Sequence, residues 1–302
     1  LQTPRTQTGS LRYMVRCFKA RSNLDENKLN EQTRTLYPDA VTMEKKLPEI
    51  LQKLGFSPIV PNIWRIRSQS IPPVVPVMRG ELHERPAFPF TYPYPFTRMD
   101  YKGYNIAIHE FGHNVEQTIS LYDVDYYMLN GVPNTAFTEA LAFVFQKRDL
   151  ELLGIKDENP EKEKMDILDK IWSMYEICGV SMLDISVWKW MYAHPNATAG
   201  ELQEAVIRLS KEIWNKYYAP VFGVKDETVL AIYSHMIGYP LYLSAYAFGQ
   251  IIEFQLENYL NGKDFANEVS RIFKQGRLTP NVWIKQATGN DLTVDPMIGS
   301  AS

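Results

Sequence analysis

Two histidines and a glutamate at close spacing are the residues best suited to carry chemistry. His109, Glu110 and His113 stand in the run His-Glu-Phe-Gly-His, inside a segment whose pattern predicts a helix. Residues four apart lie one turn apart on the same helical face, so both imidazole rings can meet one metal ion with Glu110 beside it. A helix that carries two surface histidines is the alternative. The metal interpretation predicts a hydrolytic zinc site.

A third metal ligand is expected in the next predicted helix, which begins at Thr135 after the turn residues 131–134. Glu139 stands there among apolar residues. A buried carboxylate is costly unless it is paired or binds a metal. Catalytic zinc usually takes three protein ligands, two histidines and one glutamate being a known set, and leaves a fourth position to water. Glu139 on a solvated face of its helix is the alternative, but the upstream motif favours one Zn²⁺ ion held by His109, His113 and Glu139.

The run His109–His113, followed by Phe137-Thr138-Glu139-Ala140, resembles the gluzincin metallopeptidases. The resemblance is greatest to the branch of thimet oligopeptidase and angiotensin-converting enzyme, and it is specific over residues 100–150 and looser from about residue 230 onward. It implies a zincin-like catalytic domain in which the three ligands above hold zinc and Glu110 is the general base. It also implies a peptide substrate, cut internally and of oligopeptide length.

The sequence departs from the family pattern in two ways after Glu139. Residues 141–143 read Leu-Ala-Phe where oligopeptidases commonly have Pro-Ser-Gln. Phe143 also stands where thermolysin-like and converting-enzyme sequences have an aspartate, four residues after the ligand glutamate. An acidic partner that would orient a ligand histidine is therefore unassigned, and Glu116 and Asp123 are the candidates.

A second polar cluster is expected near residues 235–246. Gly238 and Pro240 should end one helix and begin another, with Pro240 in the first turn of the second. On that helix Tyr242 and Tyr246 are four apart and share a face, and Tyr239 leads into it on the same side. Packing of the tyrosines against the protein core is the alternative to a catalytic role.

The oligopeptidase family has a histidine, a glycine-tyrosine pair and clustered tyrosines in a comparable place. By that resemblance His235 and Tyr246 are catalytic and donate hydrogen bonds to the tetrahedral intermediate. Tyr242 is a third candidate that matches less well, because its spacing from the histidine is shorter than in the family.

Helical periodicity predicts the elements that would position these groups. The metal helix should run from about Lys102 to Leu121, with Ile106, Val115 and Ile119 toward the core. Residues 122–134 should then turn the chain so that the helix carrying Glu139 returns antiparallel. Further helices are predicted at Ala40–Phe56, Met165–Ile177, Met182–Tyr192, Thr198–Tyr218 with a capping box at Thr198 and Glu201, and Gly249–Leu260.

The predicted fold class is mainly α, a zincin-like domain with a small β-sheet edge region before the metal helix. Residues 1–302 should form this one domain: a basic N-terminal arm at 1–25, a proline- and aromatic-rich sheet or loop region at 57–98, and a helical metal-site core at 99–302. In zincins the substrate lies extended along an edge strand, which by resemblance falls between about residues 63 and 85. An ordinary irregular loop is the alternative for that stretch.

Composition narrows the classes of partner. The formal net charge of -3 gives no electrostatic reason to expect nucleic acid. We expect no membrane partner, since no apolar run approaches the length of a membrane span and the N-terminus shows no signal peptide. These features favour the cytoplasm but leave compartment and oligomeric state open. The chain begins at Leu1, which leaves room for a longer parent protein.

The sequence therefore predicts a zinc-dependent metalloendopeptidase. An aminopeptidase of the same class would recognise a free N-terminus through a Gly-x-Met-Glu-Asn motif, which the sequence lacks. A catalytically silent zincin-like domain that binds a peptide or a partner protein is the main alternative. Glu110 argues against silence, whereas the missing acidic partner of a ligand histidine keeps that alternative open.

Overall fold

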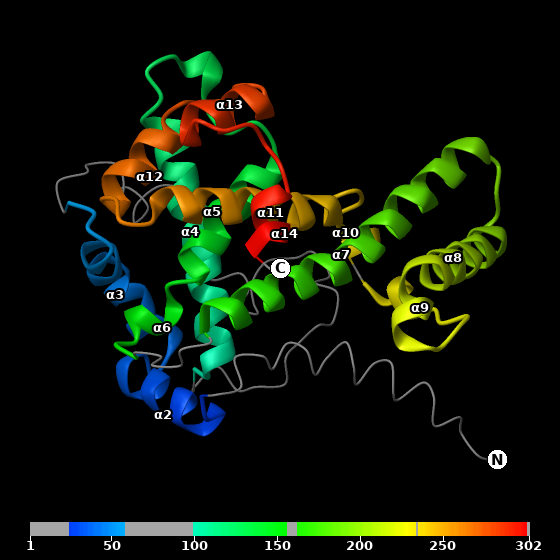
Figure 1. The fold of residues 1–302 in the computed structure, drawn as a ribbon, viewed down its shortest axis with the longest axis horizontal. Helices are drawn as coiled ribbons and strands as arrows, with labels where there is room; N and C mark the ends of the chain where they lie inside the picture. Colours follow the sequence, from blue (N-terminus) through cyan, green and yellow to red (C-terminus); the bar gives the residue numbers. More distant parts are fainter. Residues whose placement is uncertain (1–23, 58–98, 156–161, 234, 301–302) are drawn as a thin grey trace. The chain divides into compact units, whose positions relative to one another are not determined.

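The computed structural model describes residues 24–57, 99–155, 162–233 and 235–300 (Figure 1). These residues are mainly helical, as predicted, and none of them lies in a β-strand. The predicted sheet edge at 63–85 and almost all of the basic arm lie outside the described residues. None of the helices in the described part of the chain combines the length and the apolar character needed to cross a bilayer.

The described residues form two compact units. Unit 1 contains residues 162–233, 235–250 and 295–300, and unit 2 contains residues 24–57, 99–155 and 251–294. The boundary falls inside one helix, between Gln250 and Ile251. The grouping of both units into one catalytic domain stays a prediction.

Unit 2 is built around a pair of helices, α4 and α5, which pack against each other (Figure 1). Its helices are α2 (Glu26–Leu36), α3 (Ala40–Lys53), α4 (Tyr101–Tyr122), α5 (Thr135–Gln146), α6 (Asp149–Leu152), the second part of α11 (Leu243–Leu260), α12 (Phe265–Phe273) and α13 (Pro280–Thr288).

Helix α4 confirms the helix that was predicted from about Lys102 to Leu121. It starts at a capping residue, because the Asp100 carboxylate accepts a hydrogen bond of 2.7 Å from the Gly103 N–H. Val115 and Ile119 are buried as predicted, whereas Ile106 is only half-buried. The buried face of the helix also carries Tyr104, Ala107, Ile108, Phe111 and Gly112.

The chain turns back between α4 and α5 through a glycine. Gly131 has a φ of +105°, and its N–H donates to the Ser120 carbonyl at the end of α4. Helix α5 then begins at Thr135 as predicted, with Asn134 accepting from the Ala136 N–H at 3.0 Å.

Aromatic side chains fix the helix pair in the core of unit 2. The Phe145 ring of α5 contacts the rings of Phe56, Phe111 and Phe265. Fully burying a side chain of this size contributes about 1.5–3 kcal/mol. The two helices are thus held by a dense apolar cluster directly behind the face that carries the predicted metal ligands.

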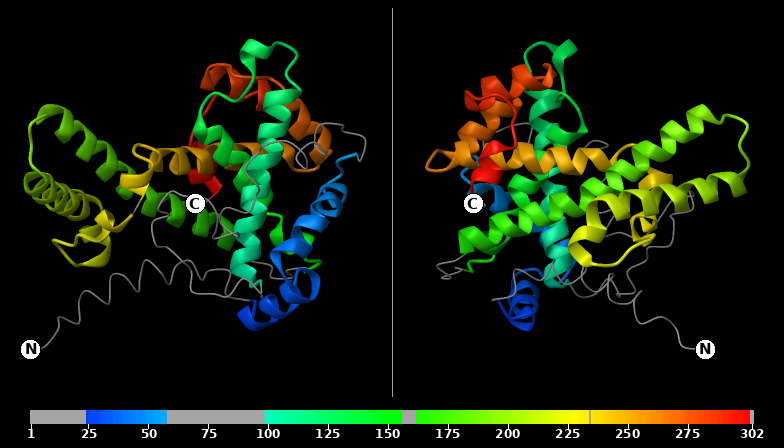
Figure 2. Two further views of the ribbon diagram at one scale, coloured as in Figure 1. Left: turned by 180° about the vertical axis from the view of Figure 1, so that it is seen from behind. Right: turned by 45° about the vertical axis from the view of Figure 1, so that its right-hand side comes forward.

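Unit 1 centres on a long helical hairpin, in which α7 (Lys162–Ala193) and α8 (Ala199–Ile213) lie side by side in both views of Figure 2. Two separate helices, Met165–Ile177 and Met182–Tyr192, were predicted where α7 is continuous. The break was wrong because Gly179 has a packing role: a Cβ there would overlap the Tyr218 hydroxyl. Small size at this position lets Tyr218 reach the helix and donate to the Tyr175 carbonyl at 2.5 Å.

Helix α8 starts with the predicted capping box, in which Thr198 and Glu201 bond each other's backbone N–H. The remaining elements of unit 1 are a π-helical turn at Trp214–Tyr218, α9 (Ala219–Phe222), a 3₁₀ turn at Val229–Ile232, α10 (His235–Gly238), the first part of α11 and α14 (Asp295–Ser300).

The break between α10 and α11 confirms the predicted helix end at Gly238. However, α11 begins at Leu243, so Pro240 precedes the helix instead of lying in its first turn, and the predicted start at Gly249 is wrong. Leu241 has a φ of +64°, which a helix cannot include. Its N–H donates to the buried Asp184 carboxylate at 2.8 Å, and this bond holds the turn in place.

A buried acid of α7 makes the stability of unit 1 dependent on pH. Glu176 is 6% exposed, its Oε2 has no hydrogen-bond partner among the described residues, and burial raises its pKa to about 7. An unfolded glutamate has a pKa of about 4.3. Because the folded pKa is the higher one, the folded state loses stability as the pH rises from about 4.3 through about 7.

Glu176→Gln keeps the size of the side chain and removes the charge. We expect the variant to gain about 1 kcal/mol of unfolding free energy relative to wild type at pH 8, after allowance for solvent screening, and much less at pH 4.5. Urea unfolding at both pH values measures the difference. An equal effect at the two values would show that Glu176 is not buried in this way.

Candidate metal centre

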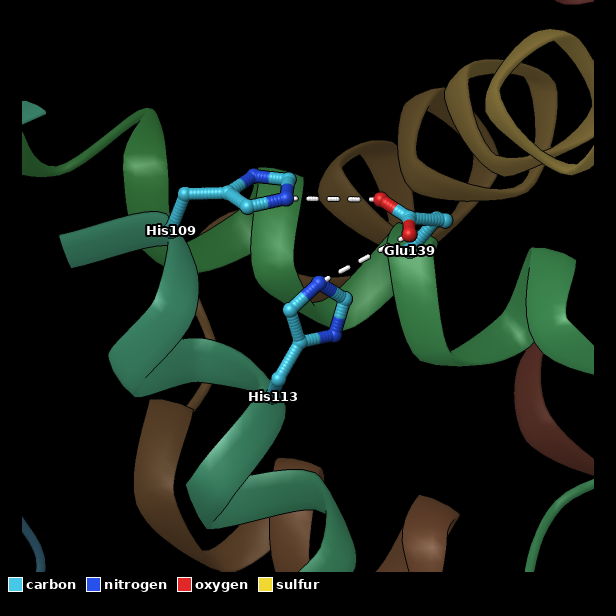
Figure 3. Close-up of side chains that lie close together, drawn as sticks. All are labelled: His109, His113 and Glu139. Carbon is cyan, nitrogen blue, oxygen red and sulfur yellow. Dashed lines mark ion pairs between the residues drawn. The ribbon is translucent and has the colours of Figure 1, made fainter. Parts of the chain in front are cut away.

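The structure brings the three predicted metal ligands together in unit 2. Figure 3 shows the two imidazole rings and the carboxylate facing one another, with His109 and His113 on α4 and Glu139 on α5. His109 Nε2 lies 3.3 Å from Glu139 Oε2, and His113 Nε2 lies 3.7 Å from Glu139 Oε1. One donor atom from each residue falls within 4.8 Å of the others.

Antiparallel pairing of α4 and α5 produces this convergence. Contacts along the pair run Asn105 to Gln146, Gly112 to Ala142 and Glu116 to Thr138, so residue numbers rise along α4 as they fall along α5. The predicted antiparallel return is confirmed.

Gly112 lets the two helices approach closely at the site. A Cβ at this position would lie 2.7 Å from the Ala142 Cα and 3.1 Å from the Leu141 carbonyl oxygen. Both are backbone atoms, so a larger residue must push the helices apart. The glycine of the His-Glu-Phe-Gly-His run therefore sets the distance between the histidines and Glu139.

Gly112→Ala is expected to lower the free energy of unfolding by about 1–3 kcal/mol through overpacking. It should also weaken metal binding, because Glu139 moves away from the histidines with α5. Gly200→Ala is the matched control, since the atom nearest to its Cβ is the Thr198 Oγ1 at 4.0 Å. That control should be neutral or more stable by up to about 1 kcal/mol. Equal stability changes in the two variants, measured by urea unfolding, would contradict close packing at Gly112.

The three side chains could hold a metal ion, because one donor atom of each lies within 4.8 Å of the others. Two ligand atoms about 2.1 Å from a tetrahedral ion lie about 3.4 Å apart, which is close to the observed 3.3 and 3.7 Å. The Glu139 side chain is 2% exposed, so its charge requires a positive partner. Burial lowers the pKa of His113 to about 4, against the opposing effects of Glu139 and of the Thr138 backbone. A neutral imidazole is the form that binds metals.

Glu110, the predicted general base, lies on the metal-ligand helix α4. It follows His109 on α4 and is half-buried. Burial raises its pKa above the ordinary value, His109 opposes this shift, and Glu139 adds to it. A carboxyl group with a raised pKa is better matched to proton transfer near neutral pH than an ordinary glutamate.

Neither predicted acidic partner is placed to orient a ligand histidine. Asp123 lies ten residues beyond His113, about 15 Å along the helix axis, and its carboxylate pairs with Lys274 at 3.7 Å. Glu116 accepts hydrogen bonds from Ser120 and Thr138, at 2.6 and 3.1 Å. Glu116 therefore links α4 to α5 through Thr138, the residue before Glu139. Neither of these hydrogen bonds involves a histidine.

An amide takes the place next to His109 that an acid was expected to fill. Gln146 Oε1 lies 3.2 Å from His109 Nδ1, and the Phe143 ring packs against the imidazole with ring centroids 5.1 Å apart. Gln146 was not among the predicted site residues. Helical spacing could have predicted it, because Gln146 stands seven residues after Glu139, about two turns along the same helical face.

The predicted catalytic residues His235, Tyr242 and Tyr246 are brought together in unit 1. The Tyr246 hydroxyl lies 3.5 Å from His235 Nε2, and the rings of Tyr242 and Tyr246 are 5.4 Å apart. All three are half-buried, whereas Tyr239 is 67% exposed. Tyr246 also packs against the apolar cluster of this unit. The catalytic role of these residues stays a prediction.

Comparisons of the chain with protein-family models, curated proteins and solved structures found no match. The resemblance to gluzincins therefore rests on the sequence motifs described above.

Proposed function

We propose that this chain is a zinc-dependent metallopeptidase that cuts peptide bonds within oligopeptides, with a zincin-like catalytic domain of the gluzincin type. The observation that supports the proposal is the convergence of His109, His113 and Glu139. Glu110 lies next to His109 on α4. His109, His113 and Glu139 would hold one zinc ion.

Zinc bound by these residues would activate a water molecule and polarise the scissile carbonyl. Glu110 takes the proton of the attacking water onto its carboxylate and later passes it to the leaving amine. The low pKa of His113 keeps its imidazole neutral and available as a ligand near pH 7. The Gln146 amide and the Phe143 ring fix the orientation of the His109 ring.

Hydrogen bonds to the developing oxyanion come from side chains of residues 235–246 in this proposal. His235 and Tyr246 are the donors, each contributing on the order of 3 kcal/mol to transition-state stabilisation. Tyr242 lies beside Tyr246 and is the third candidate. An extended substrate would pair with the sheet edge predicted between residues 63 and 85.

A catalytically silent domain that binds a peptide or a partner protein is the second candidate. The observation that favours it is the amide of Gln146 beside His109, where a carboxylate would make the imidazole a stronger ligand. The presence of Glu110 favours catalysis, because peptide hydrolysis requires a general base and peptide binding alone does not.

Mass spectrometry of a mixed-length peptide pool incubated with the purified chain tests the proposal. We expect internal cuts in short peptides, lost after chelation and restored by added zinc. The fragments would also give the length limit and the side-chain preference. Intact peptides in the presence of zinc-loaded protein would overturn the proposed activity and support the silent domain.

A further inference from the structure

We propose that Gln146 is a positioning residue for the metal ligand His109, and that a directional hydrogen-bond relay from Asp149 through Asn105 sets how it acts. The inference rests on the proposed function in one respect, that His109 binds zinc through Nε2. It assigns the role that neither Glu116 nor Asp123 fills.

The relay joins three helices of unit 2. Asp149 Oδ2 in α6 accepts hydrogen bonds from the Tyr101 hydroxyl at 2.6 Å and from the Asn105 amide at 2.5 Å, both in α4. The Asn105 carbonyl oxygen accepts from the Gln146 amide in α5 at 2.7 Å. Gln146 Oε1 lies 3.2 Å from His109 Nδ1 at the other end of the chain of contacts.

The direction of the relay follows from the carboxylate at its start. Asp149 Oδ2 accepts from the Tyr101 hydroxyl, and Asn105 turns its NH₂ group toward the same oxygen. The Asn105 oxygen then faces Gln146, whose NH₂ group donates a hydrogen bond to it. This leaves the Gln146 oxygen facing His109, and an oxygen there requires a hydrogen on Nδ1.

A hydrogen fixed on Nδ1 prepares His109 for metal binding. A neutral imidazole carries one hydrogen, so Nε2 is left with its lone pair. Nε2 and the Glu139 Oε2 then face each other as two acceptors 3.3 Å apart. A cation between them satisfies both. The relay thus selects the tautomer that binds zinc and holds the ring in the plane required.

The partly buried relay would take the place of the aspartate that the family pattern has at the position of Phe143. Partners of this kind commonly account for about 10- to 100-fold in metal affinity. Gln146→Leu removes both hydrogen bonds of the amide at similar size, so we expect its zinc dissociation constant to rise about 10- to 100-fold. Gln146→Glu still offers an oxygen to Nδ1, and as a carboxylate it should bind zinc at least as tightly as wild type does.

Two further variants separate positioning from a general structural effect. In Asp149→Asn the new amide can donate as well as accept hydrogen bonds, so the orientation of Asn105 is no longer fixed. We expect this variant to lose less zinc affinity than Gln146→Leu. Gln255→Leu is the matched control in the same unit, since this glutamine bonds the Asp291 carbonyl and the Thr293 N–H away from the metal site. It should bind zinc as wild type does.

The test is chelator competition for zinc with these variants, together with NMR of the zinc-loaded, ¹⁵N-histidine-labelled protein. We expect the His109 Nδ1–H to exchange slowly with water in wild type and Gln146→Glu, and quickly in Gln146→Leu. Circular dichroism confirms that each variant is folded, and the Glu variant keeps the comparison available if the Leu variant unfolds.

The outcomes distinguish this inference from the proposed function. Unchanged affinity and slow Nδ1–H exchange in Gln146→Leu would overturn the inference alone. Equal losses in Gln146→Leu and Gln255→Leu would also overturn it, because the effect would then be general. Zinc binding with the expected pattern but without peptide cleavage would support the inference and overturn the proposed activity. A wild-type chain that binds no zinc would overturn both.

Discussion

Replacing Glu110 by glutamine is expected to lower kcat for peptide cleavage by about 10²- to 10⁴-fold, the range attributed to general acid–base catalysis. Glutamine has nearly the same shape but cannot take a proton from water. Zinc content should stay at the wild-type level, because His109, His113 and Glu139 are unchanged. Steady-state kinetics on a peptide identified in the pool, with metal analysis of the same samples, measures both effects.

Glu116→Gln provides a matched control for that experiment. It is the same substitution on the same helix, at a buried carboxylate that accepts from Ser120 and Thr138. Glutamine keeps an acceptor oxygen, so turnover should remain within several-fold of wild type. Native turnover in Glu110→Gln, or equal losses in the two variants, would show that Glu110 is not the base.

Tyr246→Phe is expected to lower kcat by about 10²- to 10³-fold, the cost of removing one oxyanion donor. The phenyl ring should preserve the packing of Tyr246 against the apolar cluster of unit 1. KM should change little, since the lost hydrogen bond belongs to the transition state. Tyr192→Phe, at a side chain that is 71% exposed, is the control and should cut peptides as wild type does.

The proximity of His235 adds a second test of the same assignment. The Tyr246 hydroxyl lies 3.5 Å from His235 Nε2, so the effects of Tyr246→Phe and His235→Gln should be coupled. We expect the double variant to lose less than the product of the two single losses. Full activity in both single variants would remove unit 1 from the mechanism.

Local spacing was sufficient to predict that His109, His113 and Glu139 lie close together, because they belong to two regular helices. His109 and His113 share a helical face by their four-residue separation, and Glu139 follows at the start of a strongly apolar helix. A short turn with a left-handed glycine leaves those helices as antiparallel neighbours. The bounds of α4 and α5 agree with the prediction for the same reason.

Features that depend on contacts between residues distant in the chain could not be predicted from the local sequence. Gly179 marks a helix end by residue type, but in the fold it admits the Tyr218 side chain and α7 runs through it. Pro240 suits a first helical turn, but the bond from Leu241 to Asp184 holds the chain in a conformation that no helix allows. Each error arose where tertiary contact outweighed local preference.

The partner of His109 shows the same limit within the site. The resemblance to the gluzincins predicted a carboxylate as this partner, and Glu116 and Asp123 were the candidates. Gln146 and Asn105 lie on the correct faces by helical spacing, yet only the packing of α4, α5 and α6 brings them into one hydrogen-bonded series. The fold places the amide of Gln146, and not a carboxylate, beside His109.

The proposed activity requires that His109, His113 and Glu139 bind one zinc ion. Equilibrium dialysis of the wild-type chain and Glu139→Gln against zinc, with X-ray absorption spectroscopy of the bound metal, tests it most directly. We expect one ion per chain, two imidazole ligands at about 2.0–2.1 Å, and markedly weaker binding by the variant. Absence of stoichiometric binding, or binding that Glu139→Gln leaves unchanged, would contradict the claim.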